Sequence, residues 1–342
     1  RGVTLCMEPL PAPECDFVMT AAEAAKMVAD VNHPNFKLML DTKSLCGESN
    51  DPSGKAAAGL IERWGNETHY YHANDANRRA PGYGALYFHL IASALKEAGY
   101  DGIDTWIPEE KNERGKFISL LEKYELVVVS HQHQAKGNGI IEYCKSLEYY
   151  LSLSLECNPI LINSHSGRDF FNIEEQLRVI DTVEEFSVKN NNIIIAHETH
   201  RGRSGYRPFQ AMELCKLRPA MKITADFSHW TCVTESFLEN CPEILQEAIR
   251  RTKHIHARVG YTQGPQIPDP REIVWQEPVD FFFKIWEEII RYQKNQKVLF
   301  FTISTEFGPP PYMWTGTDGS PIRDQWEINL FMKDLLRKRF DA

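Results

Sequence analysis

The sequence predicts an α/β protein whose main part is a (β/α)8 barrel. Short apolar runs alternate with amphipathic segments from about residue 100 onward. The ends of these runs recur at intervals of roughly 30 residues, which is the size of one βα unit. Polar or charged residues follow nearly every run. A closed barrel builds its site from the ends of many strands, whereas an open doubly wound sheet uses one switch point, so the barrel is favoured.

Seven β-rich runs are the expected strands after residue 100. They cover residues 100–107, 125–133, 158–167, 191–200, 221–230, 253–261 and 297–308. Amphipathic segments between them show the helical period. The clearest of these expected helices cover residues 140–156, 172–190, 235–253 and 278–294. Strand–helix alternation of this kind indicates βα units and a parallel sheet.

The first part of the chain alternates in the same way. Its expected strands cover residues 3–10, 36–45 and 68–75, and its expected helices cover residues 20–32 and 85–99. The total therefore exceeds the eight strands of a single barrel. We predict a half-barrel-like β/α segment over residues 1–99 and a barrel that carries the site over residues 100–342. We also expect residues 68–74 to serve as the first strand of that barrel.

The composition excludes several classes of protein. Hydrophobic residues at 42% and charged residues at 25% are ordinary globular values. The net charge of −9 argues against nucleic-acid binding, and no run approaches the ~20 apolar residues of a membrane span. The eight cysteines form no CxxC pair, which predicts reduced thiols and a cytoplasmic location. The chain opens on Arg1 rather than on Met, so we expect an upstream segment.

Four residues of metal-ligand type stand at the ends of four consecutive expected strands. They are Glu198, Asp226, His256 and Glu306. Three carboxylates that meet at one point repel one another strongly unless a cation lies among them. Oxygen ligands with one nitrogen suit Mn²⁺, Mg²⁺, Co²⁺ or Zn²⁺. Each residue alone is more often a rim or core group, but the four together predict a site for one divalent ion.

Several motifs after Tyr100 resemble those of the xylose-isomerase-like TIM barrel superfamily of sugar isomerases and epimerases. These motifs are INSHSGRD, AHETHRGR, TADFSHW, HIHARVGYTQGPQIPDPRE and TEFGPPPY. By this resemblance the four residues above are the metal ligands, with Mn²⁺ the preferred ion. It also implies that Glu198 and Glu306 are the catalytic pair, one removing a proton and the other returning it through a metal-stabilised enediolate.

The resemblance implies a small carbohydrate substrate: a sugar, a sugar acid or a cyclitol. His229, Arg258 and His165 are the expected substrate-binding residues, because His229 completes the D-x-x-H pattern and Arg258 shares the inner face with His256. His131 and His133 fit the pocket or the rim equally well. We expect a homodimer, since an unpaired half-barrel would expose strand edges.

Other functions remain open at this point. A lyase or dehydratase acting on a keto-sugar could use the same scaffold, and a non-catalytic subunit would suit the first part of the chain. A metal-dependent nuclease of the endonuclease IV kind calls for a basic face and more histidine ligands, and the acidic charge counts against it.

Residues 1–102 resemble the C-terminal half of a barrel from the ketose 3-epimerase group. The motif HANDANRRAPGYG carries much of this resemblance. It assigns Glu8, Asp41 and His72 to metal-ligand positions and Arg78 to substrate binding. Ser44 stands where the pattern has a histidine. We therefore expect a relic or half-site here.

Overall fold

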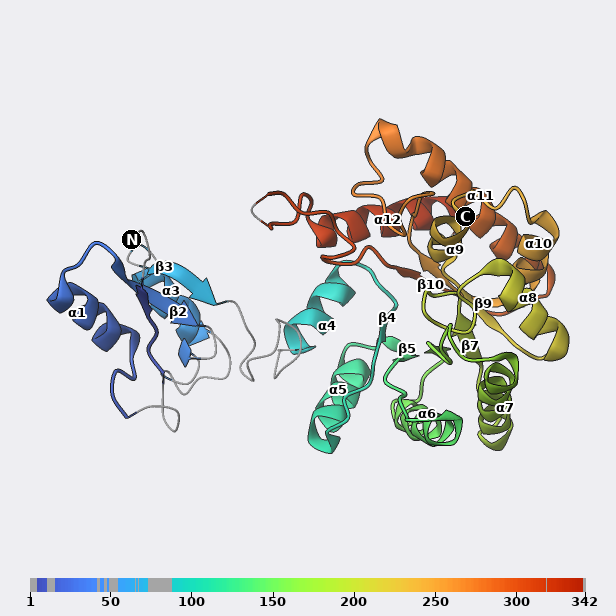
Figure 1. The fold of residues 1–342 in the computed structure, drawn as a ribbon, viewed down its shortest axis with the longest axis horizontal. Helices are drawn as coiled ribbons and strands as arrows, with labels where there is room; N and C mark the ends of the chain where they lie inside the picture. The colour runs from blue at the N-terminus through green and yellow to red at the C-terminus, as the bar shows by residue number, and fades with distance from the viewer. Residues whose placement is uncertain are drawn as a thin grey trace. The chain divides into compact units, whose positions relative to one another are not determined.

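The computed structural model describes most of the chain. The described residues are 5–10, 16–41, 44–45, 48, 55–64, 66, 68–72, 88–317 and 319–340. They form two compact units, Arg1–Ser93 and Ala94–Ala342. Figure 1 shows that each unit has a sheet of its own. The division of roles between residues 1–99 and 100–342 stays a prediction.

The first unit contains a sheet of three parallel strands in the order β1-β2-β3. The strands are β1 (Leu5–Met7), β2 (Phe36–Asp41) and β3 (Thr68–His72), and the helices of the unit include α1 (Ala21–Val31) and α3 (Lys55–Trp64). Buried side chains from α1 and β2, such as Ala24 and Leu40, form the core. Because β3 pairs with β2 in this sheet, the expectation that it starts the barrel is wrong.

Two local devices set the ends of α1. Thr20 accepts a hydrogen bond from the amide of Glu23, and the Glu23 carboxylate accepts one from the amide of Thr20, which is a capping box. The helix ends at Asn32, which has a φ of 45° and a left-handed conformation. Asparagine tolerates this conformation better than most residues, so the chain turns here toward β2.

The second unit is built on seven parallel strands in the order β10-β9-β8-β7-β6-β5-β4. They are β4 (Gly102–Thr105), β5 (Val127–Gln132), β6 (Leu161–Ser164), β7 (Ile195–Glu198), β8 (Ile223–Ala225), β9 (Thr252–Ala257) and β10 (Thr302–Thr305). Each of them overlaps one of the seven runs that the sequence predicted after residue 100. The predicted barrel is confirmed as a nearly closed parallel sheet.

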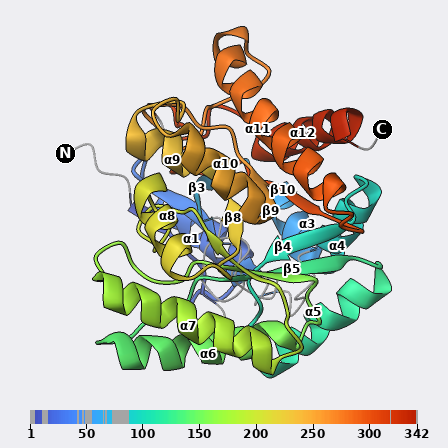
Figure 2. The same cartoon turned by 90° about the vertical axis from the view of Figure 1, so that its right-hand side faces the viewer.

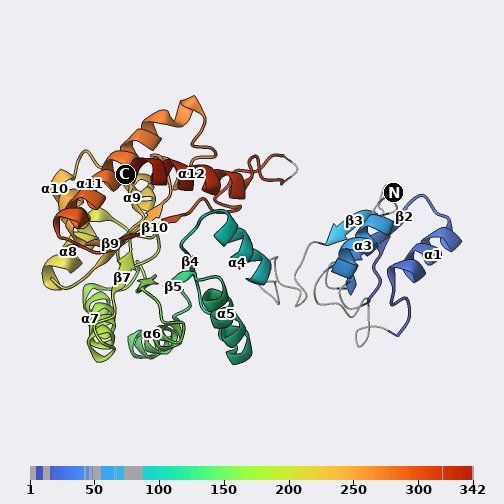
Figure 3. The same cartoon turned by 180° about the vertical axis from the view of Figure 1, so that it is seen from behind.

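Helices form a ring outside these strands, as Figures 1 and 3 show. They are α4 (Phe88–Glu97), α5 (Lys111–Lys123), α6 (Ile140–Leu155), α7 (Ile173–Lys189), α8 (Pro208–Leu217), α9 (Phe227–Thr234), α10 (Pro242–Arg251), α11 (Gln276–Asn295) and α12 (Gln325–Phe340). Figure 2 shows α6 and α7 side by side, where Leu147 and Val183 belong to one buried cluster. A larger cluster contains Trp230, Phe282 and Trp286. No helix among the described residues has both the length and the apolar character needed to cross a membrane.

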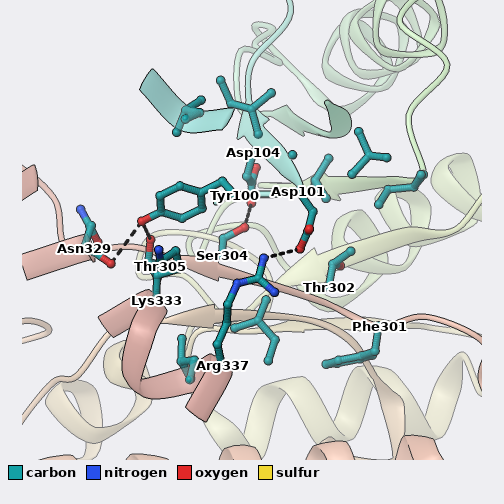
Figure 4. Close-up of a pocket in the computed structure, with 18 of the residues that line it drawn as sticks. Tyr100, Asp101, Asp104, Phe301, Thr302, Ser304, Thr305, Asn329, Lys333 and Arg337 are labelled. Atoms are coloured by element: carbon teal, nitrogen blue, oxygen red, sulfur yellow. Dashed lines mark hydrogen bonds and ion pairs between the residues drawn. The ribbon is translucent and has the colours of Figure 1, made fainter. Parts of the chain in front are cut away.

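The end strands β4 and β10 border one cavity of about 430 Å³ (Figure 4). Side chains bridge its two walls. The Tyr100 hydroxyl lies 3.1 Å from Thr305 Oγ1 and donates to the carbonyl oxygen of Asn329. Arg337 forms an ion pair with Asp101 at 2.8 Å. These contacts span the open side of the barrel, where strand pairing between β4 and β10 is lacking.

Candidate metal centre

Four side chains from neighbouring strands converge inside the barrel. Glu198 ends β7, Asp226 follows β8, His256 lies in β9 and Glu306 follows β10. One potential ligand atom from each of the four lies within 4.8 Å of the other three. Three of the side chains are buried, while that of Glu306 is 27% exposed. The convergence follows from topology, because parallel neighbours end at the same edge of the sheet.

The polar atoms of this group fit a divalent cation. Glu198 Oε1, Asp226 Oδ2, His256 Nδ1 and Glu306 Oε2 are buried and form no regular hydrogen bond with the described residues. Two of these atoms, His256 Nδ1 and Glu306 Oε2, lie 2.6 Å apart, and Arg258 Nε lies 3.3 Å from Asp226 Oδ2. Buried polar atoms normally form hydrogen bonds, so four that form none at one point need an explanation. A hard ion bound by three carboxylate oxygens and one imidazole nitrogen would satisfy all of them.

The remaining carboxylate oxygens are held by protein donors. Glu198 Oε2 accepts a hydrogen bond from Asn163 Nδ2 at 2.6 Å and lies 2.7 Å from His165 Nε2. Asp226 Oδ1 accepts hydrogen bonds from the amide and the hydroxyl of Ser228 at the start of α9. Each carboxylate is thus oriented by one oxygen, and the other oxygen stays available to a ligand.

Burial and neighbouring charges shift the pKa values of the group in opposite directions. Burial raises the pKa of Asp226 to about 7, and the charges of Glu306 and Glu198 contribute to this rise. Burial alone would lower the pKa of His256, but Glu306 and Glu198 hold it well above the ordinary value. The His256 imidazole is therefore protonated at neutral pH in the metal-free site and supplies positive charge among the carboxylates.

Arg258 supplies a second positive charge. Its Nη2 lies 2.5 Å from Glu306 Oε1, and its Nε lies 3.3 Å from Asp226 Oδ2. The guanidinium carbon is 4.2 Å from the centre of the Tyr312 ring. The guanidinium is buried, and it neutralises two of the four predicted ligands. Its predicted role in substrate binding stays a prediction.

The two predicted substrate histidines each contact one carboxylate of the group. His165 contacts Glu198, and burial lowers the pKa of its imidazole to about 3. His229 Nε2 lies 3.4 Å from Asp226 Oδ2, and neither ring nitrogen of His229 has a hydrogen-bond partner in the described part of the chain. Burial holds the pKa of His229 well below the ordinary value. Both imidazoles are neutral, so each has one nitrogen that can donate a hydrogen bond to a hydroxyl group and one that can accept.

The structure adds residues that sequence reasoning missed. Asn163 donates to Glu198, and Asp104 Oδ2 lies 2.9 Å from His256 Nε2. The Tyr312 hydroxyl lies 3.1 Å from His200 Nε2, above the buried Arg258. Asp104 and Asn163 stand near strand ends, so the rule that selected the four predicted ligands could have selected them too. Tyr312 lies in the loop after β10, where no such signal exists.

A second group of possible ligands shares Glu198. His131 Nε2 lies 3.9 Å from Glu198 Oε2, and the His131 and His165 rings are 4.4 Å apart. The ligand atoms of His131, His165 and Glu198 are all within 4.8 Å of one another. This places His131 in the interior next to the candidate centre rather than at the rim, whereas the ring of His133 packs against that of Trp106.

Comparison with known proteins identifies the fold. Residues 1–125 match the family model of the xylose isomerase-like TIM barrel. The second unit has a TIM barrel fold with seven described strands. Among solved structures, L-ribulose 3-epimerase has a TM-score of 0.51 at 11% sequence identity. The match covers 75% of this chain and 91% of that protein. D-psicose 3-epimerase of Clostridium cellulolyticum H10, solved with D-tagatose, has a TM-score of 0.50 at 13% identity and covers 74% and 93%. At these identities the likeness is one of TIM barrel fold.

One curated relative of this TIM barrel protein is more similar in sequence over a shorter span. D-psicose 3-epimerase of Agrobacterium fabrum is 38% identical over 101 residues, which are 30% of this chain and 33% of that protein. The chain thus spans about a third of the length of the curated relatives that it matches.

The predicted ligand set of the first unit lies at the ends of three neighbouring strands. Glu8 follows β1, Asp41 ends β2, and His72 ends β3 opposite Asp41 in the strand register. The Asp41 side chain is buried, and its Oδ1 accepts a hydrogen bond from the amide of Ser44 at 3.1 Å. Arg78 lies outside the described residues. Metal binding by this set stays a prediction.

Proposed function

We propose that the second unit is a divalent-metal-dependent isomerase or epimerase that acts on a sugar, a sugar acid or a cyclitol. The observation that carries this proposal is the convergence of four buried ligand atoms, none of which forms a regular hydrogen bond with the described residues. They belong to Glu198, Asp226, His256 and Glu306. The sugar epimerases among its relatives support a carbohydrate substrate. Mn²⁺ is the preferred ion, with Co²⁺, Mg²⁺ or Zn²⁺ as alternatives.

The bound ion would polarise a substrate carbonyl and stabilise the negative charge that develops on its oxygen. Glu198 and Glu306 are then the proton-transfer pair. Burial alone would raise the pKa of each, but positive neighbours hold the pKa of both below the ordinary value, so both are ionised at neutral pH. An ionised carboxylate accepts the substrate proton in the first step. In an isomerisation the same glutamate, now a carboxylic acid, returns that proton to the neighbouring carbon; in an epimerisation the other glutamate returns a proton that it takes up from solvent.

The surrounding residues orient the substrate and the acids. Neither ring nitrogen of His229 forms a hydrogen bond with the described residues, so both can serve substrate hydroxyls, and His165 Nε2 lies 2.7 Å from Glu198 Oε2. Arg258 binds either substrate oxygens or the carboxylates of Glu306 and Asp226. Asn163 and Ser228 hold one oxygen of Glu198 and Asp226 respectively, so that the reacting oxygens keep their direction.

Turnover assays on the full chain test this function. We expect a panel of ketoses, sugar acids and keto-inositols to yield a substrate with Mn²⁺ or Co²⁺, and EDTA to abolish turnover. Reaction in D₂O should place deuterium on the carbon that receives the proton, which is the same carbon in an epimerisation and the neighbouring carbon in an isomerisation. Glu198→Gln should lose at least about 100-fold in kcat, the lower range for a positioned acid–base group, while Glu213→Gln on the exposed face of α8 should match the wild type. Full activity in Glu198→Gln would exclude Glu198 as the base.

The same assay separates the alternatives. A lyase or dehydratase acting on a keto-sugar would give a product with a new double bond, which NMR detects. A non-catalytic subunit would bind no ion, so elemental analysis of the purified chain would distinguish it. A cytoplasmic location and a homodimer complete the proposal, and light scattering on the purified chain tests the dimer.

A further inference from the structure

His256 uses its two ring nitrogens for two different purposes. Its Nδ1 faces the candidate metal centre, 2.6 Å from Glu306 Oε2 and 3.5 Å from Glu198 Oε2. Its Nε2 faces the opposite way and lies 2.9 Å from Asp104 Oδ2. The ring is buried, so the hydrogen bond at Nε2 decides which nitrogen carries the proton once Nδ1 binds an ion.

The Asp104 carboxylate is fixed by donors from two other strands. Asp104 lies in β4, and its Oδ2 accepts a hydrogen bond from Ser304 Oγ in β10 at 3.0 Å. His254 Nε2 in β9 lies 3.0 Å from the same oxygen. Figure 4 shows Asp104 directed across the cavity toward Ser304. This oxygen therefore joins β4, β9 and β10 on the open side of the barrel.

Asp104 is also the acceptor that His256 requires. Asn163 Nδ2 lies 3.3 Å from His256 Nε2, but an amide nitrogen donates hydrogen bonds and cannot accept one. An ionised carboxylate accepts only, so it selects the ring form with the proton on Nε2. In that form the lone pair of Nδ1 lies beside the carboxylates of Glu306 and Glu198.

We infer that Asp104 is a positioning residue of the metal centre, which holds His256 with its proton on Nε2 and its Nδ1 directed at the ion. This role rests on the proposed function. Asp104 does not belong to the four-residue ligand group, and it would act on the ion only through His256. Partners of this kind typically change metal affinity by about 10- to 100-fold.

One other role fits the same residues. The ligand atoms of Asp104, His254 and His256 are close enough to hold an ion of their own. However, His256 Nε2 cannot bind an ion and donate a hydrogen bond to Asp104 at the same time. The two roles therefore predict different numbers of bound ions per chain.

The test compares Asp104→Asn and Asp104→Glu with Asp101→Asn in the full chain. Asp101 makes an ion pair at the surface beside the same cavity and does not contact His256, so it is the matched control. Isothermal titration with Mn²⁺ should show binding about 10- to 100-fold weaker in Asp104→Asn, with an unchanged number of ions per chain. Asp101→Asn should bind like the wild type, and Asp104→Glu should recover part of the affinity.

A second readout reports on the ring itself. Long-range ¹H–¹⁵N spectra of the Zn²⁺-loaded protein distinguish a protonated Nε2 from a protonated Nδ1. The wild type should show the His256 proton on Nε2, and Asp104→Asn should change that signal while the circular dichroism spectrum stays native. If Asp104→Asn does not fold, the wild-type spectrum and Asp104→Glu carry the test.

The outcomes separate this role from the proposed function. Wild-type protein that binds no ion would overturn the function and this role together. Unchanged Mn²⁺ affinity in Asp104→Asn, a wild-type proton on Nδ1, or the loss of one of two ions in Asp104→Asn would overturn only the role of Asp104.

Discussion

Arg258 Nη2 lies 2.5 Å from Glu306 Oε1, and this ion pair is shielded from water on the arginine side. The same guanidinium reaches Asp226. A fixed positive charge therefore stands between two of the residues that we propose as metal ligands. Protein and ion thus supply positive charge to the same carboxylates.

Removal of Arg258 should make the fold depend on metal. Arg258→Met leaves Glu306 and Asp226 without their guanidinium, and loss of one partner of a buried ion pair costs about 3–5 kcal/mol. We expect a lower melting temperature without metal and a larger rise on Mn²⁺ addition than in the wild type. Differential scanning calorimetry measures both. Arg218→Met, which breaks a half-exposed pair with Asp181, should cost under about 1 kcal/mol. Equal losses in the two variants would contradict the prediction.

Metal binding should release protons, and more of them as pH falls. His256 has a pKa well above its ordinary value and is protonated in the metal-free site at pH 7, whereas Asp226, with a pKa of about 7, is half protonated. An ion must displace both protons, so protons should be released on binding at pH 7 and affinity should rise with pH. Titration calorimetry in buffers of different ionisation enthalpy counts them. Release of no protons between about pH 6 and pH 8 would show these shifts to be wrong.

Two glycines should respond oppositely to alanine. A Cβ on Gly102 in β4 would overlap the carbonyl oxygen of Val127 in β5, so Gly102→Ala should destabilise the fold by about 1–3 kcal/mol. Gly115 lies in α5 with open space around the added atom, so Gly115→Ala should stabilise it by about 0.5–1 kcal/mol. Urea unfolding of both variants checks the sign of each change. An unchanged free energy of unfolding in Gly102→Ala would mean that β4 and β5 can move apart at this point.

Trp230 should anchor the loop after β7. Its Nε1 donates a 2.8 Å hydrogen bond to the carbonyl oxygen of Gly205, and the side chain is buried. Trp230→Phe keeps the aromatic packing but leaves the Gly205 carbonyl oxygen without its hydrogen-bond donor. This should lower the free energy of unfolding by about 1–3 kcal/mol. Trp326→Phe, whose indole is 43% exposed, should stay within about 0.5 kcal/mol of the wild type. Thermal unfolding compares the two, and matching losses would remove the hydrogen bond as the cause.

The sequence by itself determined the strands and helices of the barrel and the residues at their ends. The predicted run 191–200 contains β7, and the predicted helix 172–190 contains α7. Such features depend on the spacing of apolar residues along a few turns or strands, which a sequence displays directly. The convergence of Glu198, Asp226, His256 and Glu306 then followed from parallel topology alone, because neighbouring strand ends meet at one edge.

The tertiary structure decided which strands pair and which side chains face each other. The strand β3 has the pattern of a barrel strand, yet it pairs with β2 in the first unit, since edge pairing depends on contacts far away in the chain. Asp104 reaches His256 across 152 residues, and Arg258 folds onto Glu306. The local sequence does not indicate which way these side chains point, because their directions are set by packing among strands that meet only in the folded barrel.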